Sequence, residues 1–99
     1  MITAVRSVQA TPGKFTEAMA FAKEIAAYIK SKHGLELEIK TQVAGAVGRI
    51  AWVANYDSLA AYEATWNKIN ADPDIHKLTT KVVGVVVPGH SHDSLWRSA

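Results

Sequence analysis

The chain has 99 residues, of which 48% are hydrophobic and 20% are charged, and it has a formal net charge of +2 and no cysteine. This length and composition predict one soluble globular domain, and the lack of cysteine excludes disulfides, thiolate catalysis and iron–sulfur clusters. The basic residues form no run, so we expect no nucleic-acid partner. No apolar stretch approaches the ~20 residues that cross a bilayer, and the N-terminus does not resemble a signal peptide. We therefore expect no membrane partner and a cytoplasmic location.

The first half of the chain predicts a strand, a long helix and a second strand. Residues 2–10 are rich in β-branched side chains and stop at a Thr-Pro-Gly turn signal. Residues 14–34 place apolar side chains at the three- and four-residue spacing of one helix face. Gly34 suits the position after the last helical turn, and His33 suits the negative end of the helix dipole. Residues 35–43 alternate strictly between apolar and polar side chains, which predicts a half-buried strand.

The middle of the chain predicts a turn, a third strand and a second helix. Residues 44–48 contain two glycines and predict the turn, and residues 49–56 predict the strand. A helix is expected over residues 59–71, with Asp57 or Ser58 as the N-cap that accepts a hydrogen bond from its first turn.

Beyond this helix, the sequence predicts a short helix and a last strand. Asp72 as N-cap and Pro73 at the first helical position favour a helix that continues to about Thr79. Residues 81–87, Lys-Val-Val-Gly-Val-Val-Val, predict the strand. Because both of its faces are apolar, we expect it to be covered on both sides.

The predicted order β-α-β-β-α-β is the ferredoxin-like α+β arrangement, in which two helices cover one face of a four-stranded antiparallel sheet. Residues 1–89 form this domain. If the middle hairpin closes at Ala46–Val47, Val43 lies opposite Ile50, and apolar side chains face the helices. The other face is then a mixed polar surface.

The apolar last strand requires a cover on the helix-free side of the sheet. A second copy of the same sheet, related by a two-fold axis, is the simplest cover and gives a barrel-like homodimer. The alternative is a monomer that exposes part of an apolar face, which favours unspecific association.

Three short segments carry a resemblance to a known family. Residues 6–14, RSVQATPGK, place an arginine on the first strand and Pro-Gly-Lys at the turn into the helix, and residues 52–59, WVANYDSL, join the third strand to the second helix. Asp72–Pro73 precedes the short helix. In this order and spacing the segments resemble NIPSNAP-type domains. The resemblance implies the dimeric α/β-barrel superfamily, with a cavity between sheet and helices in each subunit.

Arg6 is the first candidate for chemistry, because an arginine within an apolar strand is costly unless it is paired. It either anchors an anion or carbonyl group at the cavity or forms an ion pair with Glu36 or Glu38, within the sheet or across the dimer. In an enzyme, Arg6 would stabilise developing enolate or carboxylate charge, and His76 or a tyrosine would move the proton. We predict three catalytic residues: Arg6, His76 and Tyr56.

Aromatic side chains with polar tips suit a small aromatic or carbonyl ligand. We predict four ligand-binding residues around the pocket: Trp52, Asn55, Tyr62 and Trp66. We expect a NIPSNAP-like small-molecule-binding protein. Its activity could be that of a cofactor-independent monooxygenase or isomerase. We expect no cofactor. One alternative is a non-catalytic ligand-binding or scaffold module. Another is a haem-binding or haem-degrading protein, because His76 with Trp66 resembles the histidine and tryptophan of haem-degrading superfamily members.

The C-terminal arm, residues 90–99, contains three side chains of types that bind metals: His90, His92 and Asp93. A closed site needs three or four ligands that converge, so we expect no metal site here. Leu95 and Trp96 are apolar residues close to the chain end. We expect them to dock in a groove, on the partner subunit of the homodimer.

Overall fold

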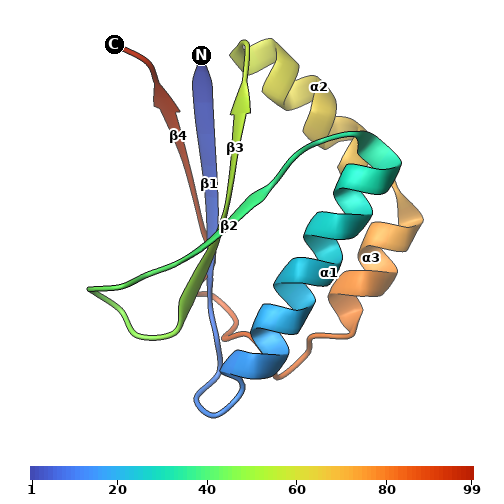
Figure 1. Ribbon diagram of the computed structural model, residues 1–99. Helices are drawn as coiled ribbons and strands as arrows, with labels where there is room; N and C mark the ends of the chain where they lie inside the picture. The colour runs from blue at the N-terminus through green and yellow to red at the C-terminus, as the bar shows by residue number, and fades with distance from the viewer.

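The computed structural model describes all 99 residues as a four-stranded antiparallel sheet with three helices on one of its faces (Figure 1). The order of strands across the sheet is β2-β3-β1-β4, and all pairs are antiparallel. This architecture confirms the predicted ferredoxin-like α+β fold. The elements are β1 (Ile2–Gln9), α1 (Phe15–His33), β2 (Glu38–Thr41), β3 (Arg49–Tyr56), α2 (Leu59–Asn70), α3 (Pro73–Thr80) and β4 (His92–Arg97).

The helices begin and end at the residues that the sequence indicates. Gly34 follows α1 in the left-handed conformation, with φ of 70°, and its N–H donates to the carbonyl of Lys30. The hydroxyl of Ser58 accepts a hydrogen bond from the backbone N–H of Ala61 and caps α2. Asp72 caps α3 in the same way. Local capping chemistry therefore fixes where each helix starts or stops.

The core lies between the helices and one face of the sheet. Even-numbered residues of β1 and β3 point toward the helices, and Ile50 and Trp52 are buried there. Trp52 donates its indole N–H to the carbonyl of Ala22 in α1, at 3.1 Å, which satisfies the one polar atom of this side chain. Ile69 of α2 is also buried and belongs to the same core, on the helix side.

The middle hairpin keeps the predicted faces but not the predicted register. Ile50 lies opposite Thr41, two residues away from the expected partner Val43. Strand β2 ends at Thr41, and Val43 is 99% exposed in a longer turn that contains Gly45 and Gly48, both with positive φ. Because the shift is an even number of residues, every side chain stays on the face that the alternation predicts.

The prediction of the fourth strand is wrong. Residues 81–87 form turns with two isolated bridges, and Gly84 has a φ of 86°, which interrupts the extended run. Val83 is 87% exposed. The fourth strand is instead β4, within residues 90–99 that we expected to form an arm, and it pairs with β1 from Ile2↔Arg97 to Ser7↔His92.

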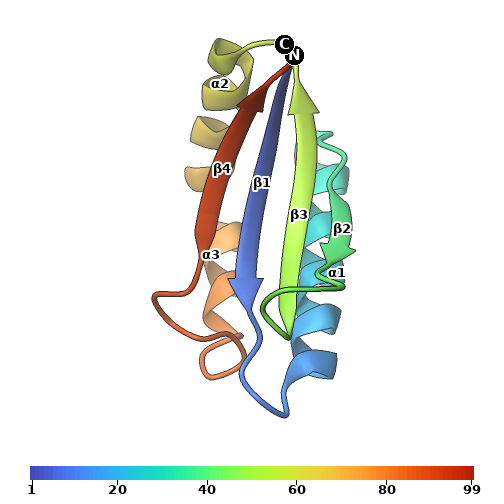
Figure 2. The same ribbon diagram turned by 90° about the vertical axis from the view of Figure 1, so that its left-hand side faces the viewer.

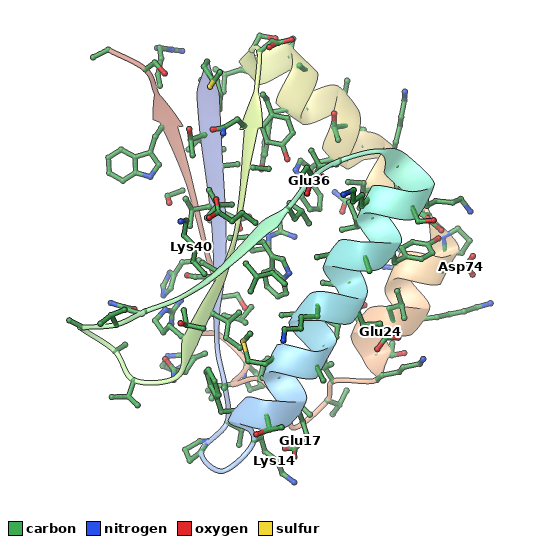
Figure 3. The ribbon with its side chains drawn as sticks, viewed as in Figure 1. Lys14, Glu17, Glu24, Glu36, Lys40 and Asp74 are labelled. Atoms are coloured by element: carbon green, nitrogen blue, oxygen red, sulfur yellow. The ribbon has the colours of Figure 1, made fainter.

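The helix-free face of the sheet is open along its whole length (Figure 2). It carries the odd-numbered residues of β1 and β3 and the even-numbered residues of β2 and β4. Lys40 lies on this side of the sheet, whereas Glu24 and Asp74 lie on the outer surface of the helices (Figure 3). None of the helices combines the length and apolar character that crossing a membrane requires.

Replacing Ile50 by alanine should destabilise the fold by about 2–5 kcal/mol, because the side chain is fully buried and the space would fill only in part. Val83→Ala is the matched control, since this aliphatic side chain is exposed and its loss should change stability by less than about 0.5 kcal/mol. Urea unfolding followed by circular dichroism measures both. Equal effects of the two substitutions would contradict this core.

Candidate functional site

A cavity of about 400 Å³ lies between the sheet and the helices. Strands β1, β3 and β4 form one wall, and helices α1, α2 and α3, together with Leu37, Val82 and Val86 from the connecting segments, form the rest. Of its 23 lining residues, 17 are hydrophobic. Mostly apolar walls with a few polar groups, at this volume, are typical of sites for small organic molecules.

Arg6 and Asp93 form the charged part of the cavity wall. They face each other across β1 and β4, with Nε to Oδ1 at 2.8 Å and Nη2 to Oδ2 at 2.9 Å. These two hydrogen bonds raise the pKa of Arg6 and lower the pKa of Asp93, so both groups are charged at neutral pH. The guanidinium carbon also lies 4.9 Å from the centre of the Trp66 ring, a cation–π distance.

Arg6 therefore has a carboxylate partner other than the two that the sequence suggested. Glu36 pairs with Lys30 instead, and Glu38 pairs with Lys40, each at 2.9 Å. The alternative in which Arg6 pairs with one of these glutamates within its own sheet is wrong, because β4 and not β2 lies beside β1 at this position.

Tyr56 adds an uncharged polar group to the cavity. Its hydroxyl oxygen accepts a hydrogen bond from the Trp66 indole N–H at 2.8 Å, and its ring packs edge-on against Tyr62, with 5.1 Å between ring centroids. Burial raises the pKa of Tyr56, and the hydrogen bond from Trp66 opposes this effect in part. The phenol therefore keeps its proton at neutral pH, and this proton has no acceptor within the chain.

His76 lies on α3 at the exposed edge of the cavity. Its Nε2 is 2.8 Å from the carbonyl oxygen of Asn70. A carbonyl oxygen only accepts hydrogen bonds, so Nε2 carries the hydrogen and the neutral ring keeps its lone pair on Nδ1. The remaining nitrogen can accept a proton.

The structure brings six of the seven predicted site residues to this one cavity: Arg6, Trp52, Tyr56, Tyr62, Trp66 and His76. The seventh, Asn55, lies on the open face of the sheet, where its amide oxygen accepts a hydrogen bond from the hydroxyl of Thr3 at 2.7 Å. Neighbouring residues of a strand point to opposite faces, so Tyr56 and Asn55 cannot both reach the cavity.

The part of the cavity that comes from β4 was not predicted. Asp93 and Leu95 line it, and no local pattern predicts this because the strand was expected at residues 81–87. Asp93 is bound to Arg6, so His90 and His92 lack a third ligand for a metal ion. Nowhere in the structure do three or more His, Cys, Asp or Glu side chains converge as a metal site would.

A second polar cluster joins the end of α1 to the start of α3. The carboxylate of Asp72, with 5% of its side chain exposed, accepts a hydrogen bond from the Tyr28 hydroxyl at 2.7 Å and lies 2.9 Å from Nε2 of His33. These contacts lower the pKa of Asp72 to about 2, the hydrogen bond from Tyr28 being the largest cause, and raise the pKa of Tyr28 to about 12. His33 thus has a tertiary role, beyond the expected interaction with the helix dipole.

No protein-family model and no curated protein sequence matches the chain. Among solved structures it is similar to a NIPSNAP domain protein from Burkholderia xenovorans, with a TM-score of 0.84 and 21% identity over all of this chain and 95% of that chain. A NIPSNAP family protein of unknown function from Agrobacterium tumefaciens has a TM-score of 0.81 and 16% identity, over 100% of this chain and 88% of that chain. An antibiotic biosynthesis monooxygenase has a TM-score of 0.71 and 10% identity, over 100% of this chain and 99% of that chain.

These likenesses show the fold, which is shared with NIPSNAP-family proteins and with proteins of the monooxygenase type. They confirm the resemblance to NIPSNAP-type domains at the level of three-dimensional structure. At these identities they assign no activity to this chain.

The Asp72 cluster should make stability pH-dependent. Its folded-state pKa of about 2 lies below the ordinary value of 3.8, so the carboxylate contributes stability above about pH 4, and this contribution is lost as pH falls through about 2. Asp72→Asn keeps a good helix cap but removes the charge, and should reduce this acid dependence. Asp57→Asn, at an exposed position, is the control. Thermal melts between pH 2 and pH 5 test this, and identical pH profiles for both variants would disprove it.

Proposed function

We propose that this chain is a NIPSNAP-like small-molecule-binding protein whose ligand occupies the cavity between the sheet and the helices. The observation that carries this proposal is a largely apolar cavity in which two hydrogen-bond donors, Arg6 and Tyr56, both contact Trp66. An apolar body with one oxygen acceptor fits such a site best. This supports a small carbonyl or aromatic compound as ligand.

Arg6 and Tyr56 would anchor the oxygen atom of the ligand. Asp93 takes the Nε and Nη2 groups of Arg6, which leaves Nη1 as a donor, and the Tyr56 hydroxyl has an unused proton. Since Asp93 already balances the charge of Arg6, a neutral carbonyl group binds without an unpaired charge in the cavity.

The same arrangement supports proton transfer without a cofactor. Nδ1 of His76 would remove a proton from the carbon next to the carbonyl group, and Arg6 with Tyr56 would stabilise the enolate oxygen that forms. Proton removal of this kind is a first step open to a cofactor-independent isomerase or monooxygenase. A non-catalytic binding or scaffold module would use the same cavity without this step.

The residues of the cavity do not fit a haem group. The Nε2 of His76, the nitrogen at the tip of the ring, donates to Asn70 and is not free for iron. The wall of the cavity also contains the Arg6–Asp93 ion pair beside Trp66. These residues therefore do not support the haem-binding alternative.

The open face of the sheet supports a homodimer of the α/β-barrel type. Trp96 is 65% exposed on this face and pairs with Thr3 of β1. Two residues further along β1, Val5 pairs with Val53 of β3 on the same face. Every residue of β4 is exposed in the single chain. A second sheet packed on this face would bury Trp96 and these two valines.

An aromatic ketone tests the proposed cavity. We expect 1-tetralone to quench the fluorescence of Trp52 and Trp66 saturably, and Tyr56→Phe to weaken binding about fivefold, as expected for one hydrogen bond of about 1 kcal/mol. Tyr28→Phe is a matched control, because it removes a phenol that hydrogen-bonds Asp72 and does not line the cavity. Equal losses in both variants, or no saturation, would refute this site.

The same ketone separates an enzyme from a binding module. In D₂O, the protein should accelerate exchange of the hydrogens next to the carbonyl group, and His76→Gln should reduce that rate about 10²-fold. Binding without accelerated exchange would leave a binding module as the function. Proton NMR follows the loss of signal.

The homodimer is tested by the mass in solution. Light scattering should give twice the monomer mass, and Trp96→Ser should raise the dimer dissociation constant by about tenfold or more. Phe15→Ser is the control, since it removes an exposed aromatic group at the start of α1, away from the open face. A monomeric wild-type protein at micromolar concentration would contradict the dimer.

A further inference from the structure

A second hollow, of about 290 Å³, lies on the open face of the sheet, on the opposite side from the cavity described above. It is much more polar than that cavity, since only three of its eight lining residues are hydrophobic. Its polar lining consists of Ser7, Lys40, Thr41, Gln42 and Arg49. None of these residues carries a negative charge.

The register of the sheet explains why there is a hollow here. Lys40, Ala51 and Ser7 lie side by side on β2, β3 and β1. All three side chains point to the open face. The small methyl group of Ala51 leaves space between the two polar neighbours, and Arg49, two residues before Ala51 on the same strand, closes one end.

Arg49 is a half-buried cation with no carboxylate partner. Its Nη2 group donates to the Ser7 hydroxyl at 2.6 Å and to the carbonyl oxygen of His90 at 3.1 Å. The hydrogens on Nε and Nη1 have no partner within the chain. Arg6, at the cavity, differs in being paired bidentately with Asp93. A partly desolvated guanidinium without a counter-charge is a site that an anion stabilises.

Lys40 adds a second positive charge to the same hollow. Its ammonium group pairs with Glu38 at 2.9 Å, and more than half of each side chain is exposed. An exposed ion pair of this kind is worth at most about 1 kcal/mol, so the flexible ammonium group can turn toward an anion at little cost. The Ser7 hydroxyl and Gln42 amide can donate further hydrogen bonds.

We propose that this hollow is a binding site for a small oxyanion, a carboxylate or phosphate group, held by Arg49 and supported by Lys40 and Ser7. It does not depend on the proposed function of the cavity, because the two sites lie on opposite faces of the sheet and share no charged residue. In a homodimer formed through the open face, the bound anion would lie at or near the interface between the two sheets.

The probe is inorganic phosphate, titrated into the full chain at constant ionic strength and followed by isothermal calorimetry and amide NMR shifts. We expect saturable binding, with the largest shifts at the backbone amides around Ser7, Lys40 and Arg49. Arg49→Gln should weaken binding about tenfold or more, because it removes the charge-assisted hydrogen bonds, and Lys40→Gln should weaken it less. Acetate in place of phosphate shows which oxyanion is preferred.

Arg97→Gln is the matched control, because Arg97 is also an arginine without a carboxylate partner but is exposed at the far end of β4. It should leave phosphate binding unchanged. Circular dichroism establishes that each variant is folded, and Arg49→Lys, which keeps the charge, should recover part of the affinity.

Two results would overturn the proposal. One is an absence of saturable phosphate binding, and the other is an equal loss of affinity in Arg49→Gln and Arg97→Gln. If wild-type protein binds no phosphate while Arg49→Gln dissociates a homodimer, the partner of Arg49 is a carboxylate of the second subunit and not a free anion. Failure of 1-tetralone to bind the cavity would not bear on any of these outcomes.

Discussion

The alternation of side chains along β1 is the constraint on which the rest of the structure depends. This strand lies between β3 and β4, so its even-numbered residues set the face that the helices cover and its odd-numbered residues set the open face. Arg6 is therefore placed among apolar side chains below the helices, and Ser7 is placed on the opposite side. A change of one residue in register would exchange the two faces and turn the polar side chains of Thr3, Ser7 and Gln9 toward the core.

A cation in that position requires a counter-charge, which connects Arg6 to the placement of β4. Asp93 reaches it only because β4 pairs with β1 in the observed register, with Arg6 directly opposite Asp93. About half of each side chain is exposed, so the ion pair itself adds at most about 1 kcal/mol. Its larger effect is on the cavity, because it leaves the wall polar and without net charge.

Much of this arrangement follows from the sequence, because periodicity and capping are local. The faces of the strands, the three helices and their caps at Gly34, Ser58 and Asp72 were predictable, and so was the placement of six candidate residues in one cavity. The fourth strand was not, because residues 81–87 have the stronger β-propensity while Gly84 adopts a conformation that ends an extended segment. Pairing with β1 selects residues 92–97 instead, four of which are polar, and no local pattern contains that information. Asn55 was misplaced for a simpler reason, since its neighbour Tyr56 already takes the inward position.

The two arginines of the sheet then imply ligands of different kinds. Arg6 is neutralised by Asp93, so an anion in the cavity would have to displace a carboxylate that is held by two hydrogen bonds, whereas a neutral carbonyl needs only the donors that remain. Arg49 is held by a hydroxyl and a carbonyl group, and both leave its charge uncompensated. A neutral ligand gains little there, and an oxyanion gains the full attraction of a half-buried cation. With these partners, Arg6 would disfavour a charged ligand on one face of the sheet, and Arg49 would favour a negatively charged ligand on the other face.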